Sequence, residues 1–351
     1  MHAIVAAMKI STTIRVALAS ACLLCMAPAA SAQNSSFDTY LQTVAAKARA
    51  QGVSQQTIDR IFAGLQPSTR VMELDADNRP SGSSSSSNSF PSMAREMERY
   101  NTDARISGGK RAYQRLYSVG QQISREYGVP APILFGIWGH ETSYGAVKGN
   151  FDLAQALATL AWEGRRRDLF EPELIALLKI AERENLPRSQ MQGSWAGAFG
   201  NPQFLPSIYL RLAVDGNKDG HTDIWNSEVD ALYSIANYFR DAGWRTGQPW
   251  AVRAYVPGNF DDSGIQNTMN SPVCERVHDR HSKWMTVREW RARGVIPQGA
   301  IGDDVMASLF EPDGRSAPGY LLTQNYRVIL GYNCSNCYAF KVGMLADEIA
   351  R

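Results

Sequence analysis

A single acidic residue lies within an otherwise apolar helical pattern near the middle of the chain. Residues 133–145 read ILFGIWGHETSYG, and Ile133, Ile137 and Glu141 recur at spacings of four. Side chains at that spacing share one face of a helix, so Glu141 is predicted to face the core. Because lost hydration raises a carboxyl pKa, such a group could protonate the leaving oxygen of a glycosidic bond. The alternative is a structural carboxylate that pairs with an arginine or caps a loop.

A glycine-rich segment follows about fifty residues later. Residues 193–204 read GSWAGAFGNPQF, in which glycines and alanines surround aromatic residues and one amide. Small residues allow a backbone to approach a ligand closely, and Ser194 and Gln203 could bond hydroxyl or acetamido groups. A tight surface loop without a ligand is the competing interpretation.

The third pattern, residues 215–230, reads DGNKDGHTDIWNSEVD and indicates hard oxygen ligands. Oxygen-bearing side chains at alternate positions, followed by a glycine, match the first half of an EF-hand calcium loop. Asn226 stands where that loop has a bidentate Glu, so Glu228 or Asp230 would have to close a longer loop. A metal-free turn is the alternative. The predicted ligands are Asp215, Asn217, Asp219, His221, Asp223 and Asp230.

The sequence around these three patterns is mainly helical. Helical periodicity marks an N-terminal lobe over 33–127, interrupted by a Ser-rich loop at 79–92, and a core over 128–249. Residues 250–323 are rich in Gly, Pro and Asp with short apolar runs, which predicts an irregular, strand-containing insert. Residues 324–351 end in an amphipathic helix and are predicted to return to the core.

The first 32 residues are typical of a secretory signal. Lys9 and Arg15 precede an apolar run that ends in Ala30-Ser31-Ala32, an A-x-A cleavage pattern. The run is short for a membrane anchor, and the ASAC sequence ending at Cys22 lacks the leucine usually found three residues before a lipidated cysteine. We therefore expect a periplasmic protein without a lipid anchor.

The charge balance limits the class of partner, and the cysteines indicate a disulfide. Without residues 1–32 the chain has 34 basic and 34 acidic residues, a balance that argues against nucleic acid and suits a neutral polymer such as glycan. Cys274, Cys334 and Cys337 would lie in an oxidising compartment, which favours one disulfide. Cys334 could pair with Cys274 or with Cys337; the longer loop closed by Cys274 would restrict the unfolded chain more, which slightly favours that pair.

The motifs together resemble the lytic murein transglycosylase B family. GIWGHETSYG, ALATLAW with RRRDLF, GSWAGAFGNPQFLPS, AVDGNKDGHTDIW, SIANYFRDAGW and YNCSNCYAFKVGMLAD occur in that family's order and spacing. The resemblance implies a mainly α (α+β) fold: a lysozyme-like catalytic core, a helical N-terminal lobe and a small strand-containing insert. It also implies cleavage of the β-1,4 bond between N-acetylmuramic acid and N-acetylglucosamine, without water, which leaves a 1,6-anhydromuramoyl end.

The same resemblance implies roles for individual residues. Glu141 matches the family's single acid/base, and a set of substrate contacts comprises Ser194, Gln203, Tyr238, Tyr332, Asn333 and Phe170. The 215–230 loop matches a structural calcium site, and no organic cofactor is expected. We expect a monomer that acts on peptidoglycan glycan strands; cell-wall synthesis or division complexes are candidate partners that the residues do not specify. A lysozyme-type hydrolase is disfavoured because no second carboxylate is evident, and a non-catalytic peptidoglycan-binding scaffold is disfavoured because Glu141 is present.

Overall fold

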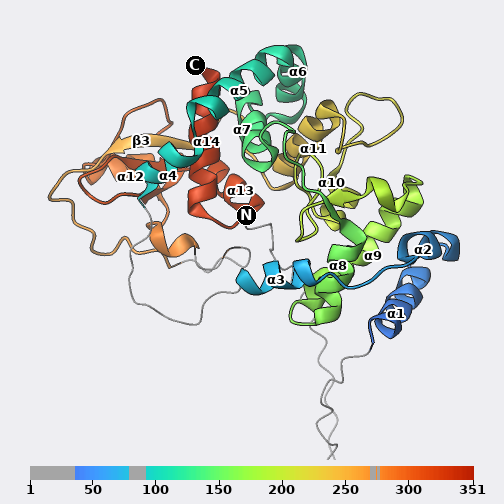
Figure 1. Cartoon of the computed structure of the whole chain (residues 1–351). Helices are drawn as coiled ribbons and strands as arrows, with labels where there is room; N and C mark the ends of the chain where they lie inside the picture. The colour runs from blue at the N-terminus through green and yellow to red at the C-terminus, as the bar shows by residue number, and fades with distance from the viewer. Residues whose placement is uncertain (1–35, 79–91, 269–273, 275–276) are drawn as a thin grey trace, which may run out of the picture.

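Helices form most of the described chain. The computed structural model describes residues 36–78, 92–268, 274 and 277–351 (Figure 1). The predicted signal segment and all but the last residue of the Ser-rich loop lie outside the described residues. The helices are α1 (Phe37–Ala50), α2 (Gln55–Phe62), α3 (Thr69–Asp77), α4 (Met93–Tyr100), α5 (Asp103–Arg115), α6 (Tyr117–Tyr127), α7 (Ala131–Thr142), α8 (Leu153–Glu163), α9 (Arg167–Arg183), α10 (Pro206–Leu212), α11 (Glu228–Asp241), α12 (Val287–Ala292), α13 (Gln324–Tyr332) and α14 (Asn336–Ala350), with 3₁₀ turns at Arg188–Gln190 and Val277–Arg280.

The first three helices begin at serine caps. Ser36, Ser54 and Ser68 each accept a bond from a backbone N–H in the first turn that follows, which satisfies a donor with no partner inside the helix. These helices pack against α8 and α9, beside one another in Figure 1. Buried Asp75 of α3 pairs with Arg165 and Arg166 between α8 and α9, which ties the N-terminal helices to the core.

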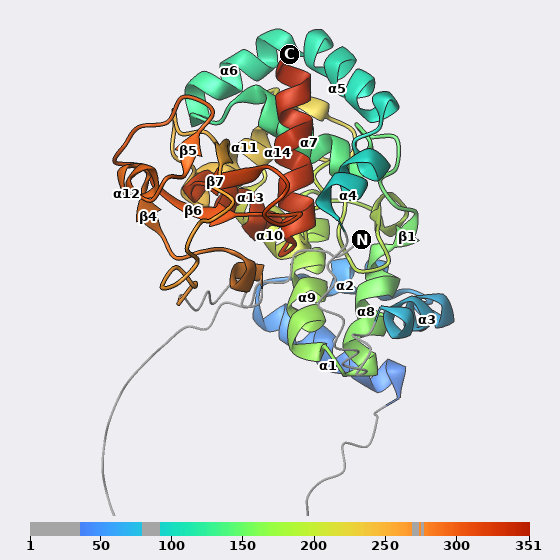
Figure 2. The same ribbon diagram turned by 90° about the vertical axis from the view of Figure 1, so that its left-hand side faces the viewer.

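Helix α7 is the centre of the core. Most of its side chains are buried all round, and it packs against α5, α6, α11 and α14. Gly136 allows close packing on α14, because a Cβ there would lie 2.9 Å from the carbonyl oxygen of Val342 in that helix. Figure 2 shows α14 running alongside α7, and α14 also packs against α4. The helix that carries Glu141 is therefore held directly by the last helix of the described chain.

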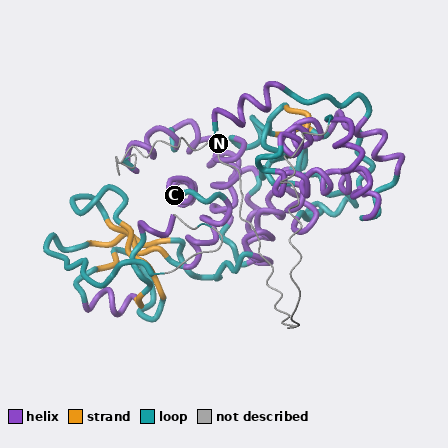
Figure 3. Tube along the Cα trace, turned by 90° about the horizontal axis from the view of Figure 1, so that it is seen from below, coloured by secondary structure: helices purple, strands orange, loops and turns teal. Residues whose placement is uncertain are grey.

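The insert is a small antiparallel sheet. Its strands are arranged in the order β4-β6-β7-β3-β5, and Figure 3 shows them gathered at one end of the molecule. Buried side chains including Trp290, Val295 and Leu321 form a second hydrophobic cluster beneath the sheet. The strands are β3 (Ala251–Tyr255), β4 (Met285–Thr286), β5 (Ile296–Pro297), β6 (Met306–Phe310) and β7 (Gly319–Leu322), while β1 (Phe151–Asp152) pairs with β2 (Gln192–Gly193) in the core.

A disulfide joins the insert to the core. Cys274 and Cys334 are bonded, with their Cα atoms 5.4 Å apart, whereas Cys337 is a free thiol. The prediction that Cys334 pairs with Cys274 is confirmed. Because Cys334 lies between α13 and α14, the bond fixes the segment that leads into α14.

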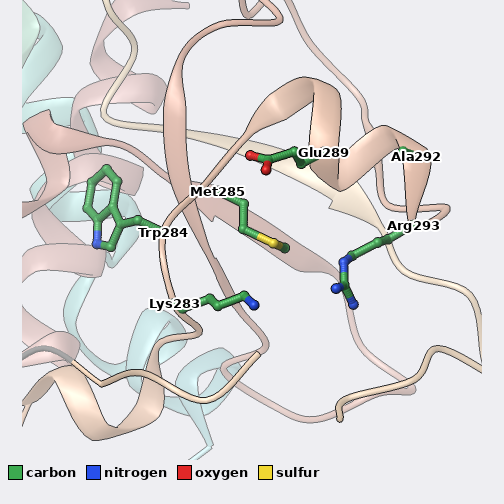
Figure 4. Close-up of a pocket in the computed structure, with 6 residues that line it drawn as sticks. All are labelled: Lys283, Trp284, Met285, Glu289, Ala292 and Arg293. Carbon is green, nitrogen blue, oxygen red and sulfur yellow. The ribbon is translucent and has the colours of Figure 1, made fainter. Parts of the chain in front are cut away.

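The insert also contains a cavity of its own, distant in sequence from Glu141. The cavity has a volume of about 460 Å³ and is lined by Lys283, Trp284, Met285, Glu289, Ala292 and Arg293 (Figure 4). None of the predicted site residues lines it. Within the described ranges, no helix is both long and apolar enough to cross a bilayer.

Candidate active site

Glu141 lies in the last turn of α7 and is bonded by a tyrosine from α14. The hydroxyl of Tyr338 donates to Oε1 of Glu141 at 2.5 Å. Burial raises the pKa of Glu141 from 4.5 to about 7, although the bond from Tyr338, which favours the carboxylate, acts in the opposite direction. No arginine or lysine pairs with Glu141 within the described chain, so Glu141 is not an ion-paired structural carboxylate; its hydrogen-bond partner there is Tyr338. A carboxyl with this pKa can both give and take a proton near neutrality.

The end of α7 is fixed by the glycine-rich loop. The indole of Trp138 donates to Oδ1 of Asn201 at 2.9 Å, and the hydroxyl of Thr142 donates to the Asn201 carbonyl at 3.1 Å. Ser143 and Tyr144 then adopt left-handed backbone angles that terminate the helix after Thr142, one residue beyond Glu141. The position of Glu141 therefore depends on bonds to Asn201 from both sides of it in sequence.

Ser194 and Gln203 lie in the same loop and are nearly buried. Ser194 Oγ accepts from the Ala198 N–H at 3.0 Å. The amide nitrogen of Gln203 donates to the carbonyls of Gly200 at 3.0 Å and Lys148 at 3.2 Å, while its backbone adopts a positive φ of 51°. These bonds orient the amide and leave its oxygen without a bond from any described residue. A polar group held this way can bond a ligand without first being ordered.

Close backbone approach explains one of the glycines. A Cβ on Gly149 would lie only 2.2 Å from the carbonyl oxygen of Gly193, and Gly149 also has a positive φ of 86°. The segment after Glu141 and the segment before Ser194 therefore meet backbone to backbone, which no larger residue at Gly149 would permit.

Three tyrosines pack beside Glu141. The Tyr332 hydroxyl donates to the Pro202 carbonyl at 2.5 Å, and the Tyr238 hydroxyl donates to the Gly331 carbonyl at 3.0 Å. The rings of Tyr332 and Tyr338 are nearly parallel, with centroids 6.4 Å apart, and those of Tyr238 and Tyr332 are 4.8 Å apart. Tyr332 is fully buried, so its ring packs in the core and does not face solvent.

The two remaining predicted substrate contacts, Asn333 and Phe170, lie in different environments. Asn333 is the C-cap of α13 and is partly exposed, two residues from Gly331, whose carbonyl bonds Tyr238. Phe170 is only 2% exposed within the core, and the Arg166 guanidinium lies 4.6 Å from its ring centroid. A side chain covered in this way packs helices together, and the structure does not place Phe170 with the residues around Glu141.

Sequence reasoning missed Tyr338, the residue in direct contact with Glu141. The residue lies in the motif YNCSNCY, five positions after Asn333, so its place in that motif was the available signal. No local pattern connects it to Glu141, because the two residues are 197 positions apart.

The 215–230 loop has the internal bonding of a pre-arranged turn. Asp215 accepts the backbone N–H groups of Asp219 and Gly220 at 3.2 and 2.9 Å. Buried Asp230 accepts those of Gly216, Asn217 and Asp223 at 2.8 to 3.2 Å. In the part of the chain that the structure describes, no three acidic, histidine or cysteine side chains converge closely enough to hold a metal. The loop therefore offers the oxygen ligands that calcium prefers. In this structure those ligands do not converge on a single point.

Asn226 and Asp223 bond one another in this loop. The Asn226 amide donates to Asp223 Oδ2 at 3.0 Å, and Asp223 Oδ1 accepts the backbone N–H of Trp225 and of Asn226. The carboxylate of Asp223 is thus engaged in the turn at the start of α11. Asp230, in the first turn of that helix, accepts the N–H groups of Gly216 and Asn217 in the first half of the loop.

The comparisons with known proteins agree with one another. A family model described as "Transglycosylase SLT domain" matches residues 36–347. Membrane-bound lytic murein transglycosylase B of Escherichia coli K12 is 31% identical over 303 residues, which are 85% of this chain and 79% of the relative.

Two groups of solved structures are also similar. SltB3 of Pseudomonas aeruginosa, solved with NAG-anhNAM-pentapeptide, is 35% identical with a TM-score of 0.77 over 90% of this chain and 79% of its own. Slt35 of E. coli, solved with calcium, is 29% identical with a TM-score of 0.72 over 92% and 94% of the two chains. Because the family model spans nearly the whole described chain and the folds coincide, this chain belongs to the transglycosylase SLT domain family and, within it, to the lytic murein transglycosylases of type B.

Proposed function

We propose that this chain is a peptidoglycan lytic transglycosylase in which Glu141 is the only acid/base. The observation that carries the proposal is the contact between Glu141 and Tyr338, at a carboxyl group whose pKa is raised to about 7 by burial. Relatives of the same family are named lytic murein transglycosylases, and one was solved with an anhydro-muramoyl fragment. The substrate is the β-1,4 bond between N-acetylmuramic acid and N-acetylglucosamine.

The first step is proton donation. Protonated Glu141 gives its proton to the glycosidic oxygen as the bond from C1 of the muramoyl sugar breaks, so the departing strand leaves with a free hydroxyl. The raised pKa keeps a useful fraction of Glu141 protonated at neutral pH. The bond from Tyr338 then stabilises the carboxylate that remains.

The second step needs no water. The Glu141 carboxylate takes the proton from the C6 hydroxyl of the same muramoyl sugar, and the O6 oxygen forms the new bond to C1. Glu141 ends protonated, as it began, and the product carries a 1,6-anhydro ring. Intramolecular attack has an effective-molarity advantage over water, which explains why one carboxylate is sufficient.

Ser194, Gln203 and Asn333 are the proposed polar contacts with the sugars. Ser194 and Gln203 are held by backbone bonds in the glycine-rich loop, and Asn333 ends α13 beside the tyrosine cluster. Tyr238 and Tyr332 support the same wall through their ring contacts. In this proposal the three polar side chains orient the glycan, and the two tyrosines position α14.

Calcium binding and export complete the proposal. Asp215, Asn217, Asp219, the His221 carbonyl, Asp223 and Asp230 would supply oxygen ligands, and bound calcium would stabilise the loop that precedes α11. The N-terminal 32 residues would direct the chain to the periplasm, where its glycan substrate lies.

The mass of the reaction product tests the mechanism. Purified protein should release muropeptides that are lighter by one water than those made by a hydrolase from the same sacculi. Glu141→Gln should lose nearly all turnover, about 10²- to 10⁴-fold, because an amide cannot donate and then accept the proton. Glu98→Gln, an exposed glutamate in α4, is the matched control and should retain activity. A hydrated reducing end in the wild-type products would instead identify a hydrolase.

A further inference from the structure

A cavity of about 660 Å³ lies between α5 and the segment that follows Glu141. We refer to it as the α5 pocket. Its lining includes Arg105, Gly108, Arg111, Arg115, Ser143 and Tyr144. The lining residues of α5 recur at spacings of three and four, so they form one stripe along the helix.

The pocket is held in a fixed relation to the end of α7. The Tyr144 hydroxyl donates to the Arg105 carbonyl at 2.9 Å, and Arg105 itself donates to Ser143 Oγ at 3.4 Å. Gly108 faces the Tyr144 ring, from which a Cβ would be only 3.2 Å away. The residues directly after Glu141 therefore form one wall of the pocket.

Three arginines line this pocket, and no acidic residue is among the lining. Arg115 is neutralised by both carboxylate oxygens of Glu228. Arg111 is exposed and makes no ion pair or hydrogen bond with any described residue. The charge of Arg111 is therefore available to a ligand.

Arg105 likewise has no carboxylate among its hydrogen-bond partners in the described chain. Its guanidinium donates to the Tyr100 carbonyl at 3.0 Å and lies 3.2 Å from Nδ1 of His140, so its partners are neutral groups. Burial, followed by the charge of Arg105, lowers the pKa of His140 to about 3, so the imidazole does not add a proton near neutrality. Two cations thus share the pocket with no carboxylate, an arrangement that favours an anionic ligand.

We propose that the α5 pocket binds a carboxylate of the peptide stem carried by the peptidoglycan strand. This inference rests on the proposed function, because the stem is attached to the muramoyl sugar on which Glu141 acts. Arginine is suited to the ligand, since its planar guanidinium bonds a carboxylate through two parallel N–H groups. A peptide stem that is not cross-linked through its last residue ends in a free carboxylate, whereas the glycan hydroxyl and acetamido groups are neutral. The pocket would therefore distinguish strands that carry stems from strands that do not.

The test compares three substrates made from the same glycan strands. One keeps its peptide stems, one has lost them to an amidase and has had the newly exposed lactyl carboxylates chemically amidated, and one has stems whose carboxylates are chemically amidated. Arg111→Gln should lower kcat/KM on the stem-bearing strands by roughly 3- to 10-fold, as expected for one partly exposed charge-assisted contact. The same variant should leave kcat/KM on the stripped and the amidated strands unchanged.

Arg125→Gln is the matched control. Arg125 is an exposed arginine in α6 that makes no ion pair or hydrogen bond with the described residues and does not line the pocket. An equal loss in Arg125→Gln would show a general attraction to an anionic polymer and would overturn the proposal. An Arg111→Gln variant that matches the wild type on stem-bearing strands, or that loses as much on stripped strands, would overturn it as well. Failure of the proposed function is separate, because the wild type would then form no anhydro product from any substrate.

Discussion

Oε1 of Glu141 accepts a 2.5 Å hydrogen bond from the hydroxyl of Tyr338, and neither residue lies near the other in sequence. The carboxyl group is partly buried and lacks a cationic partner, so its protonated form is favoured; the tyrosine limits that preference. Burial, which raises the pKa of Glu141, and the hydrogen bond from Tyr338, which lowers it, together place that pKa near neutrality. The same balance makes the pair sensitive to substitution.

Glu141→Gln should stabilise the protein at alkaline pH. The folded pKa of about 7 exceeds the ordinary value of 4.5, so the folded chain binds the proton more tightly than the unfolded chain. The stability that this proton contributes is present below pH 4.5 and is lost as the pH rises to about 7. Above that, the variant should gain roughly 1 to 3 kcal/mol in free energy of unfolding. Urea unfolding at pH 4.5 and 8 measures it, and a gain that is the same at both pH values would contradict the raised pKa.

Tyr338→Phe should shift the alkaline limb of the activity profile. Removing the hydroxyl takes away a donor that stabilises the carboxylate, so the pKa of Glu141 should rise further, by about one pH unit. The proton donor would then persist to higher pH. The measurement is kcat/KM against pH, with Tyr320→Phe in the insert as the control. Superimposable profiles for Tyr338→Phe and the wild type would argue that the contact has no influence on the acid.

Calcium should raise the melting temperature of the wild type and chelator should lower it. A ligand that binds only the folded state contributes about 2.7 kcal/mol at a hundredfold excess over its dissociation constant. Asp219→Asn should abolish the calcium dependence, because the exposed carboxylate of Asp219 is a proposed ligand. Asp304→Asn, an exposed residue of the insert, should keep it. Melting curves that do not respond to calcium would reduce the loop to a turn.

Replacing Cys274 and Cys334 together by serine should destabilise the protein. The bond closes a loop with a sequence separation of 60 residues, and loop-closure entropy for that length corresponds to about 4 kcal/mol. Cys337→Ser, which removes the free thiol, should have a much smaller effect. Non-reducing peptide mapping checks the pairing independently: a peptide linking Cys337 to either partner would refute it.

Local patterns predicted the parts of the site that lie close together in sequence. The stripe through Ile137 identified Glu141 as an acid facing the core, and small residues marked the loop that holds Ser194 and Gln203. Short apolar runs also indicated strands in the insert. Each of these signals depends on neighbouring residues, so a single sequence contains it.

Contacts between distant segments could not be predicted in the same way. The partner of Glu141 is set by how α14 packs on α7, and the strand order of the insert is set by pairing across long connections. Phe170 shows a second limit: it was predicted to contact substrate, but its side chain is buried in the core. An aromatic residue in a motif can pack in the core as readily as it can line a groove. The disulfide was predictable only as a preference between two loops.

The contact between α7 and α14 also joins two segments that are synthesised at different times. A ribosome makes the chain from its N-terminus, so Glu141 emerges well before the helix that carries Tyr338, which lies 197 residues later. The environment that sets the pKa of Glu141 is complete only when α14 has folded against α7. A chain interrupted before α14 would therefore lack both the helix that packs on α7 and the tyrosine that bonds Glu141.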